Sequence, residues 1–194
     1  MGKLAFLFPG QGAQVVGMGK DFFDAYDLAK KRFAEADEAL GYSISKLCFE
    51  GPADQLQLTE HTQPAILTVA VIASELLRAE GIEPEIAAGH SLGEYAALVA
   101  AGVLSFQDAV LLVHKRGAYM QEAVPVGEGA MAAVIGLDDE TIVSACAEAS
   151  SVGAVQAVNF NCPGQTVIAG TAKGVEHAVT LLQEKGAKKA VILP

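Results

Sequence analysis

Gly89-His90-Ser91-Leu92-Gly93 forms a G-x-S-x-G pattern between two different kinds of segment. The apolar run 86–88 before it is typical of a short strand, and the alanine-rich stretch 94–101 after it is typical of a helix. A serine on a sharp strand-to-helix turn needs neighbours without Cβ atoms, because the two elements approach closely there. The pattern therefore predicts a nucleophile elbow, with Ser91 above a helix N-terminus whose free N–H groups favour developing negative charge.

A glycine-rich loop follows the first predicted strand of the chain. Residues 4–8 are continuously apolar and are ended by Pro9, which predicts a buried strand. The loop Gly10-Gln11-Gly12-Ala13-Gln14 comes next, at a position where open α/β sheets commonly bind ligands. It matches neither the dinucleotide nor the P-loop phosphate pattern. An ordinary tight turn with solvated glutamines stays an alternative.

Helical periodicity accounts for most of the remaining residues up to position 125. It predicts a surface helix over 21–40 and a buried helix over 62–80, with Pro64 in the first turn of the buried helix. Ser105 and Asp108 form a capping box that opens a further helix. Arg116 lies at the edge of the apolar stripe of that helix. Such an arginine either extends outward to water or reaches into a cleft to meet an anion, and spacing alone leaves both open.

Residues 126–194 have a different pattern from residues 1–125. Alternating strand and helix signals predict the order β-α-β-β-α-β, a ferredoxin-like split unit. The first part supplies only two convincing strands, which make a poor sheet alone. The expected fold class is thus α/β, with an incomplete subdomain over 1–125 and a small subdomain over 126–194.

Composition narrows the class of protein. The 194 residues are 52% hydrophobic and carry a net charge of -10, which disfavours binding to nucleic acid or to an anionic membrane. Cys48, Cys146 and Cys162 follow no metal or disulfide spacing, so we expect neither a disulfide framework nor a zinc site, and a cytoplasmic location fits best. We also expect no metal and no cofactor. No apolar run is long enough to predict a membrane span.

Several motifs converge in chain order. They are the loop 10–14, Thr62-Gln63-Pro64-Ala65, the elbow continued to Tyr95, Arg116, and Asn161-Cys162-Pro163-Gly164-Gln165. Together they resemble the malonyl-CoA:acyl-carrier-protein transacylases of fatty-acid synthesis and the related acyltransferase domains of polyketide synthases. The resemblance runs from Leu4 to Pro194. It implies a hydrolase-like large subdomain, an inserted ferredoxin-like small one, and an active site in the cleft between them.

The resemblance also implies roles for individual residues. Ser91 is the expected nucleophile, which takes the malonyl group from CoA and passes it to the phosphopantetheine thiol of acyl carrier protein. The backbone N–H groups of Gln11 and Leu92 are the expected oxyanion hole. Arg116 is expected to pair with the malonyl carboxylate. Two further residues of the shared motifs, Gln63 and Asn161, are expected substrate contacts.

The sequence departs from the family in one respect. The family's general base is a histidine in a Pro-Phe-His-type segment just after the small subdomain, and Pro194 ends the sequence before that point. His90 is no substitute, because the residue before an elbow serine faces the other way. We therefore expect that the chain lacks the C-terminal third of a transacylase. A polyketide-synthase acyltransferase domain, a serine esterase and a non-catalytic carrier-docking fragment stay as alternatives.

Overall fold

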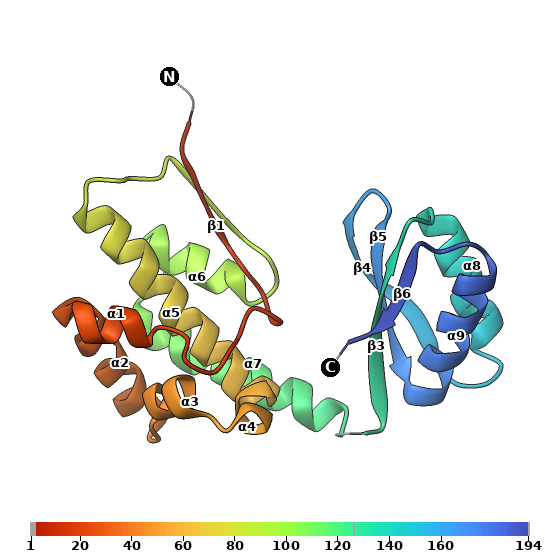
Figure 1. Cartoon of the computed structure of the whole chain (residues 1–194), viewed down its shortest axis with the longest axis horizontal. Coiled ribbons are helices and arrows are strands. Elements are labelled where there is room, and N and C mark those ends of the chain that lie inside the picture. The colour runs from red at the N-terminus through yellow and green to blue at the C-terminus, as the bar shows by residue number, and fades with distance from the viewer. Residues whose placement is uncertain (1–2, 126, 194) are drawn as a thin grey trace. The chain divides into compact units, whose positions relative to one another are not determined.

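Two groups of helices and strands make up the chain (Figure 1). The computed structural model describes residues 3–125 and 127–193. It divides into a first unit, Met1–Ala123, and a second unit, Val124–Pro194, each with its own hydrophobic core. The predicted boundary at Val126 falls outside the described residues. Strands and helices occur in both units, so the expected α/β class is confirmed.

The first unit, over its described residues, contains one small parallel sheet. Strand β1 (Ala5–Phe8) pairs with β2 (Ile86–Gly89), and the register places Phe8 opposite Gly89. The two predicted strands are therefore present. Because the strands run in parallel, the loop after β1 and the turn after β2 leave the sheet at the same end. The glycine-rich loop and the serine turn thus become neighbours although about 80 residues separate them in the sequence.

Seven helices lie in the described part of the first unit. They are α1 (Lys20–Ala25), α2 (Asp27–Leu40), α3 (Ile44–Glu50), α4 (Ala53–Gln57), α5 (Thr59–Ala79), α6 (Gly93–Ala100) and α7 (Phe106–Ala123). The single helix expected over 21–40 is wrong, because Tyr26 has an extended backbone (φ -130°, ψ 128°) that separates α1 from α2. The helix expected from residue 62 begins at Thr59 instead. Pro64 therefore lies inside α5 rather than in its first turn.

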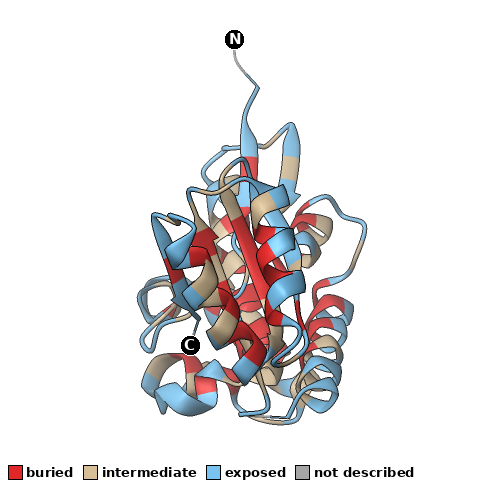
Figure 2. Ribbon diagram, turned by 90° about the vertical axis from the view of Figure 1, so that its right-hand side faces the viewer, coloured by how far each residue is buried: buried red, intermediate tan, exposed pale blue. Residues whose placement is uncertain are grey.

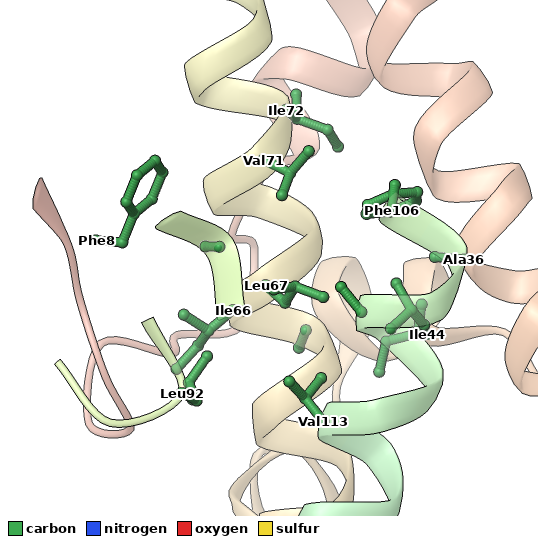
Figure 3. Packing of buried hydrophobic residues seen from close by; sticks show 14 of the residues in the cluster. Phe8, Ala36, Ile44, Ile66, Leu67, Val71, Ile72, Leu92, Phe106 and Val113 are labelled. Atoms are coloured by element: carbon green, nitrogen blue, oxygen red, sulfur yellow. The ribbon is translucent and has the colours of Figure 1, made fainter. Parts of the chain in front are cut away.

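Helix α5 forms the centre of the first unit. Its apolar side chains Ile66, Leu67, Val71 and Ile72 are almost fully buried, as predicted for a helix that is apolar nearly all round. Figure 3 shows these side chains among buried residues of α7 and of the turn at Leu92. Figure 2 shows that the surrounding helices have exposed outer faces and buried inner faces. The core therefore holds the two helices and the turn that carry the predicted site residues.

The described part of the second unit is a four-stranded antiparallel sheet with two helices. Its elements are β3 (Gly129–Ile135), α8 (Asp139–Ala149), β4 (Val155–Cys162), β5 (Gln165–Thr171), α9 (Ala172–Glu184) and β6 (Lys189–Ile192). This is the predicted order of elements, and the strand order in the sheet is β4-β5-β3-β6. Asp138 and Thr171 cap the two helices through their side chains. The buried side of the sheet packs on both helices, and Val134 and Ile168 of the sheet share one cluster with Ile142 of α8 and Leu182 of α9.

None of the helices within residues 3–125 and 127–193 is both long enough and apolar enough to cross a membrane.

Candidate active site

The turn that carries Ser91 has the backbone geometry of a nucleophile elbow. Ser91 has φ 56° and is the only non-glycine residue with a positive φ among the described residues. This left-handed conformation is costly for a residue with a Cβ atom and persists only where the surroundings enforce it. A Cβ on Gly89 would clash with the backbone of Gly93, and a Cβ on Gly93 would clash with the carbonyl oxygen of Phe8. Both glycines of the pattern are therefore required by the close approach of β1, β2 and α6.

The glycine-rich loop lies against this turn. A Cβ on Gly10 would come within 2.8 Å of the carbonyl oxygen of His90, so the loop backbone adjoins the elbow. The side chain of Gln11 donates from Nε2 to Thr59 Oγ1 at 3.4 Å, which links the loop to the start of α5. Within the described first unit, the backbone N–H groups of Gln11 and Leu92 have no protein acceptor. These are the two groups that were predicted to form an oxyanion hole.

Arg116 points toward Ser91 from helix α7. Its Nη2 donates to Ser91 Oγ at 3.0 Å, and its Nη1 donates to Gln63 Oε1 at 2.7 Å. Of the two orientations that helical spacing left open for Arg116, the structure shows the inward one. Gln63 is fully buried on α5, and its Nε2 contacts Met120 Sδ at 3.4 Å. The Arg116 guanidinium is thus held by a hydrogen bond to the Gln63 amide, which solvent does not reach.

The three arginines of the chain differ in their charge partners. Arg32 forms two hydrogen bonds to the Glu75 carboxylate, at 2.8 and 2.6 Å, and these raise the pKa of Arg32. Arg78 lies 3.2 Å from Glu83. Arg116 is half-buried and has no carboxylate partner among the described residues. An unpaired guanidinium beside a serine hydroxyl favours the binding of an anionic group at that place.

The structure also describes Asn161 and two of the histidines. Asn161 is on β4 in the second unit, and its side chain is exposed. His61 Nδ1 lies 2.9 Å from the Gln55 carbonyl oxygen, and His114 Nδ1 lies 3.1 Å from the Glu60 carbonyl oxygen. Within the described residues, Ser91 Oγ is bonded to Arg116 and to no histidine. No group of three or more His, Cys, Asp and Glu side chains there could hold a metal ion.

Two neighbours of the site carried no functional signal in the sequence. Thr59, which contacts Gln11, precedes the residue at which α5 was expected to begin. Met120, which contacts Gln63, has the spacing of the apolar stripe of α7, and only the packing of α5 on α7 shows its contact with the amide. Both contacts join segments that are distant in the sequence, so local patterns do not contain them.

Comparison with known proteins finds relatives of high identity in both sequence and structure. The chain is 55% identical to the malonyl CoA-acyl carrier protein transacylase of Bacillus subtilis (strain 168), over all of this chain and 61% of that protein. A crystal structure of acyl-carrier-protein S-malonyltransferase from Burkholderia pseudomallei 1710b is 54% identical, with a TM-score of 0.91, over all of this chain and 63% of that one. A type II polyketide-synthase acyl-carrier protein in complex with its malonyl-transacylase also matches, with a TM-score of 0.92 and 47% identity over 99% of this chain and 62% of that one.

The chain therefore spans slightly less than two thirds of the length of these relatives. The profile of the acyl transferase domain matches residues 5–193, which is nearly every residue of the sequence. This match shows that the chain belongs to the acyl transferase domain family.

Proposed function

We propose that the protein transfers a malonyl group from CoA to the phosphopantetheine thiol of an acyl carrier protein, through an ester on Ser91. Relatives of this chain are malonyl CoA-acyl carrier protein transacylases, and one related transacylase has been seen in complex with an acyl-carrier protein. The observation that carries the proposal is the contact of Arg116 with Ser91 Oγ at 3.0 Å. This contact supports the proposal, because an unpaired cation beside the serine hydroxyl would attract an acyl group that bears an acid.

The reaction has two half-reactions. In the first, Ser91 Oγ attacks the thioester carbonyl, the carbon–sulfur bond breaks, and CoA leaves as the thiol. In the second, the phosphopantetheine thiol attacks the Ser91 ester and regenerates the hydroxyl. A general base has to accept the serine proton. We propose that this base is the histidine that the family carries in a Pro-Phe-His-type segment just after the small subdomain.

We infer that the Gln11 and Leu92 N–H groups hold the oxyanion of each tetrahedral intermediate. Two observations support this assignment. Both groups lack a protein acceptor in the described first unit, and both follow paired strands at one end of the β1–β2 sheet. Leu92 is 1% exposed, so its N–H lies in a region of low effective dielectric, where a hydrogen bond to an oxyanion is strong.

Arg116 is proposed to select acyl groups that bear an acid. In a malonyl ester on Ser91 the carboxylate carbon is two bonds from the ester carbonyl carbon, within reach of a guanidinium that already touches Oγ. An acetyl group has no carboxylate and leaves the guanidinium without an anionic partner. Because Gln63 is fully buried, its proposed contribution is to orient Arg116 rather than to touch the substrate.

Further assignments rest on the family resemblance. We infer that the first unit is the N-terminal part of a hydrolase-like subdomain and that the second is the ferredoxin-like small subdomain. The antiparallel sheet with two helices supports the second assignment. Asn161 stays a predicted substrate contact. A cytoplasmic location stays a prediction from the cysteine pattern.

The proposal is tested by intact-mass spectrometry of the full-length natural protein after brief incubation with malonyl-CoA. We expect a malonyl adduct that maps to Ser91, disappears in Ser91→Ala, and is discharged by a carrier protein bearing phosphopantetheine. Ser105→Ala serves as a matched control, because Ser105 caps α7 and is distant from the turn in sequence. Absence of an adduct from the folded full-length protein would contradict the proposal.

A further inference from the structure

We propose that His114 is a positioning residue for Arg116. Its Nδ1–H donates to the Glu60 carbonyl, which lacks its usual donor four residues later because residue 64 is a proline, and so fixes helix α7 against the turn of α5 that carries Gln63.

The need for such a donor follows from the place of Pro64. In a helix the N–H of each residue donates to the carbonyl four residues earlier, and proline has no N–H. Pro64 is the sixth residue of α5, so the missing hydrogen bond is the one to the carbonyl of Glu60. The hydrogen bond from His114 to that carbonyl is part-buried, so loss of the donor would leave the carbonyl only partly accessible to water and would lower stability. The first turn of α5 is thus a place where a second helix can dock through its side chains.

His114 supplies the missing donor from helix α7. Its Nδ1 lies 3.1 Å from the Glu60 oxygen. A carbonyl oxygen only accepts, so Nδ1 carries the hydrogen. The imidazole ring also packs against the ring of Tyr42, with 5.8 Å between the ring centroids. Ring packing and the hydrogen bond together hold this side chain in one orientation.

The same turn of α5 carries the partner of Arg116. Glu60 and Gln63 are three residues apart on α5, and His114 and Arg116 are two residues apart on α7, so the two hydrogen bonds are adjacent links between the helices. Gly117 allows the close approach, since a Cβ there would lie 2.7 Å from the Cα of Glu60. A shift of α7 along α5 would therefore break both links together.

The inference rests on the proposed function of Arg116, because alignment matters for transfer only if the guanidinium binds the acyl carboxylate. Two variants separate the donor from the ring. His114→Asn keeps an N–H donor at the same number of bonds from the backbone, whereas His114→Phe keeps a ring against Tyr42 and removes the donor. His177→Phe is the matched control, because His177 lies on α9 in the second unit.

The experiment compares kcat/KM for malonyl-CoA and acetyl-CoA in the full-length natural protein. We expect His114→Phe to lower the malonyl-to-acetyl ratio of kcat/KM about tenfold, which corresponds to the free energy of about one hydrogen bond. In His114→Asn, which keeps a donor, the ratio should stay close to the wild-type value. Pro64→Ala restores a backbone N–H at position 64, so His114→Phe should lower the melting temperature less in that background than in the wild type. In the wild-type background we expect a loss of about 2 to 8 °C.

A separate readout does not depend on activity. Nitrogen-15 NMR of the histidine rings should show the hydrogen of His114 on Nδ1. A hydrogen on Nε2 alone, or additive effects of Pro64→Ala and His114→Phe on the melting temperature, would overturn the hydrogen bond. An unchanged ratio in His114→Phe, with Arg116→Ala still lowering it, would overturn the positioning role alone. If Arg116→Ala itself leaves the ratio unchanged, the proposed function fails instead.

Discussion

Replacing Gln63 by leucine tests how the site orients Arg116. Leucine is close to glutamine in size, so Gln63→Leu fills the same buried volume and removes the Oε1 acceptor that lies 2.7 Å from Arg116 Nη1. The variant also loses the weak contact of Nε2 with Met120 Sδ. The fold should therefore persist, and the Arg116 guanidinium should lose its hydrogen bond to residue 63.

The magnitude follows from the kind of hydrogen bond that is lost. A hydrogen bond to a charged group contributes about 1.5 to 3 kcal/mol, and each 1.4 kcal/mol is about a factor of ten. We therefore expect kcat/KM for malonyl-CoA to fall by roughly 10- to 100-fold. Transfer of an acetyl group, which does not use the guanidinium, should change by less than about threefold.

The assay measures kcat/KM for malonyl-CoA and acetyl-CoA with an acyl carrier protein as acceptor. Gln107→Leu is the matched control, because Gln107 is exposed near the start of α7 and should leave both values unchanged. A melting temperature recorded for each variant separates loss of the site from loss of the fold. Equal losses for malonyl and acetyl in a folded Gln63→Leu protein would refute the orienting role.

Three further predictions concern the elbow, the thiols and a helix cap. Gly93→Ala should destabilise the protein by about 3 kcal/mol, because the new Cβ would clash with backbone of Phe8; a melting temperature within about 2 °C of wild type would contradict this. Burial raises the pKa of the Cys48 thiol to about 12, so brief treatment of the native protein with iodoacetamide should modify the exposed Cys162 and spare Cys48. Peptide mass mapping measures the labelling of each cysteine, and equal labelling of both would be inconsistent with the packing. The backbone N–H of Thr141 donates to the Asp138 carboxylate and lowers its pKa, so this cap stabilises the fold above the ordinary pKa of 3.8 and loses that effect as the pH falls to the lowered pKa. The difference in melting temperature between wild type and Asp138→Asn should shrink over that pH range, and a constant difference would count against the cap.

The elbow and the α/β class could be predicted from the sequence because their causes are local. The spacing of Gly89 and Gly93 around Ser91 reflects backbone contacts within one turn, and the alternation of strands and helices in the second unit follows periods of two and 3.6 residues. The inward direction of Arg116 was not decided by spacing. It depends on Gln63, which lies 53 positions earlier and meets Arg116 only when α5 packs on α7.

Errors in the helix boundaries have a physical cause as well. The apolar spacing continues through Tyr26, so periodicity alone does not show the extended residue that separates α1 from α2. At α5 the proline suggested a first turn, where a missing N–H costs nothing. The helix nevertheless extends from Thr59, and a tertiary contact from His114 satisfies the carbonyl that Pro64 leaves without a helical donor. Tertiary packing thus overrides the local signal at that position.

The central claim is that Arg116 binds the carboxylate of an acyl group carried by Ser91. The most direct test is the ratio of kcat/KM for malonyl-CoA to that for acetyl-CoA in Arg116→Ala, with Arg78→Ala as the control that removes an arginine already paired with Glu83. We predict that the ratio falls by at least about tenfold in Arg116→Ala and stays at the wild-type value in Arg78→Ala. A ratio in Arg116→Ala equal to that of the wild type would contradict the account.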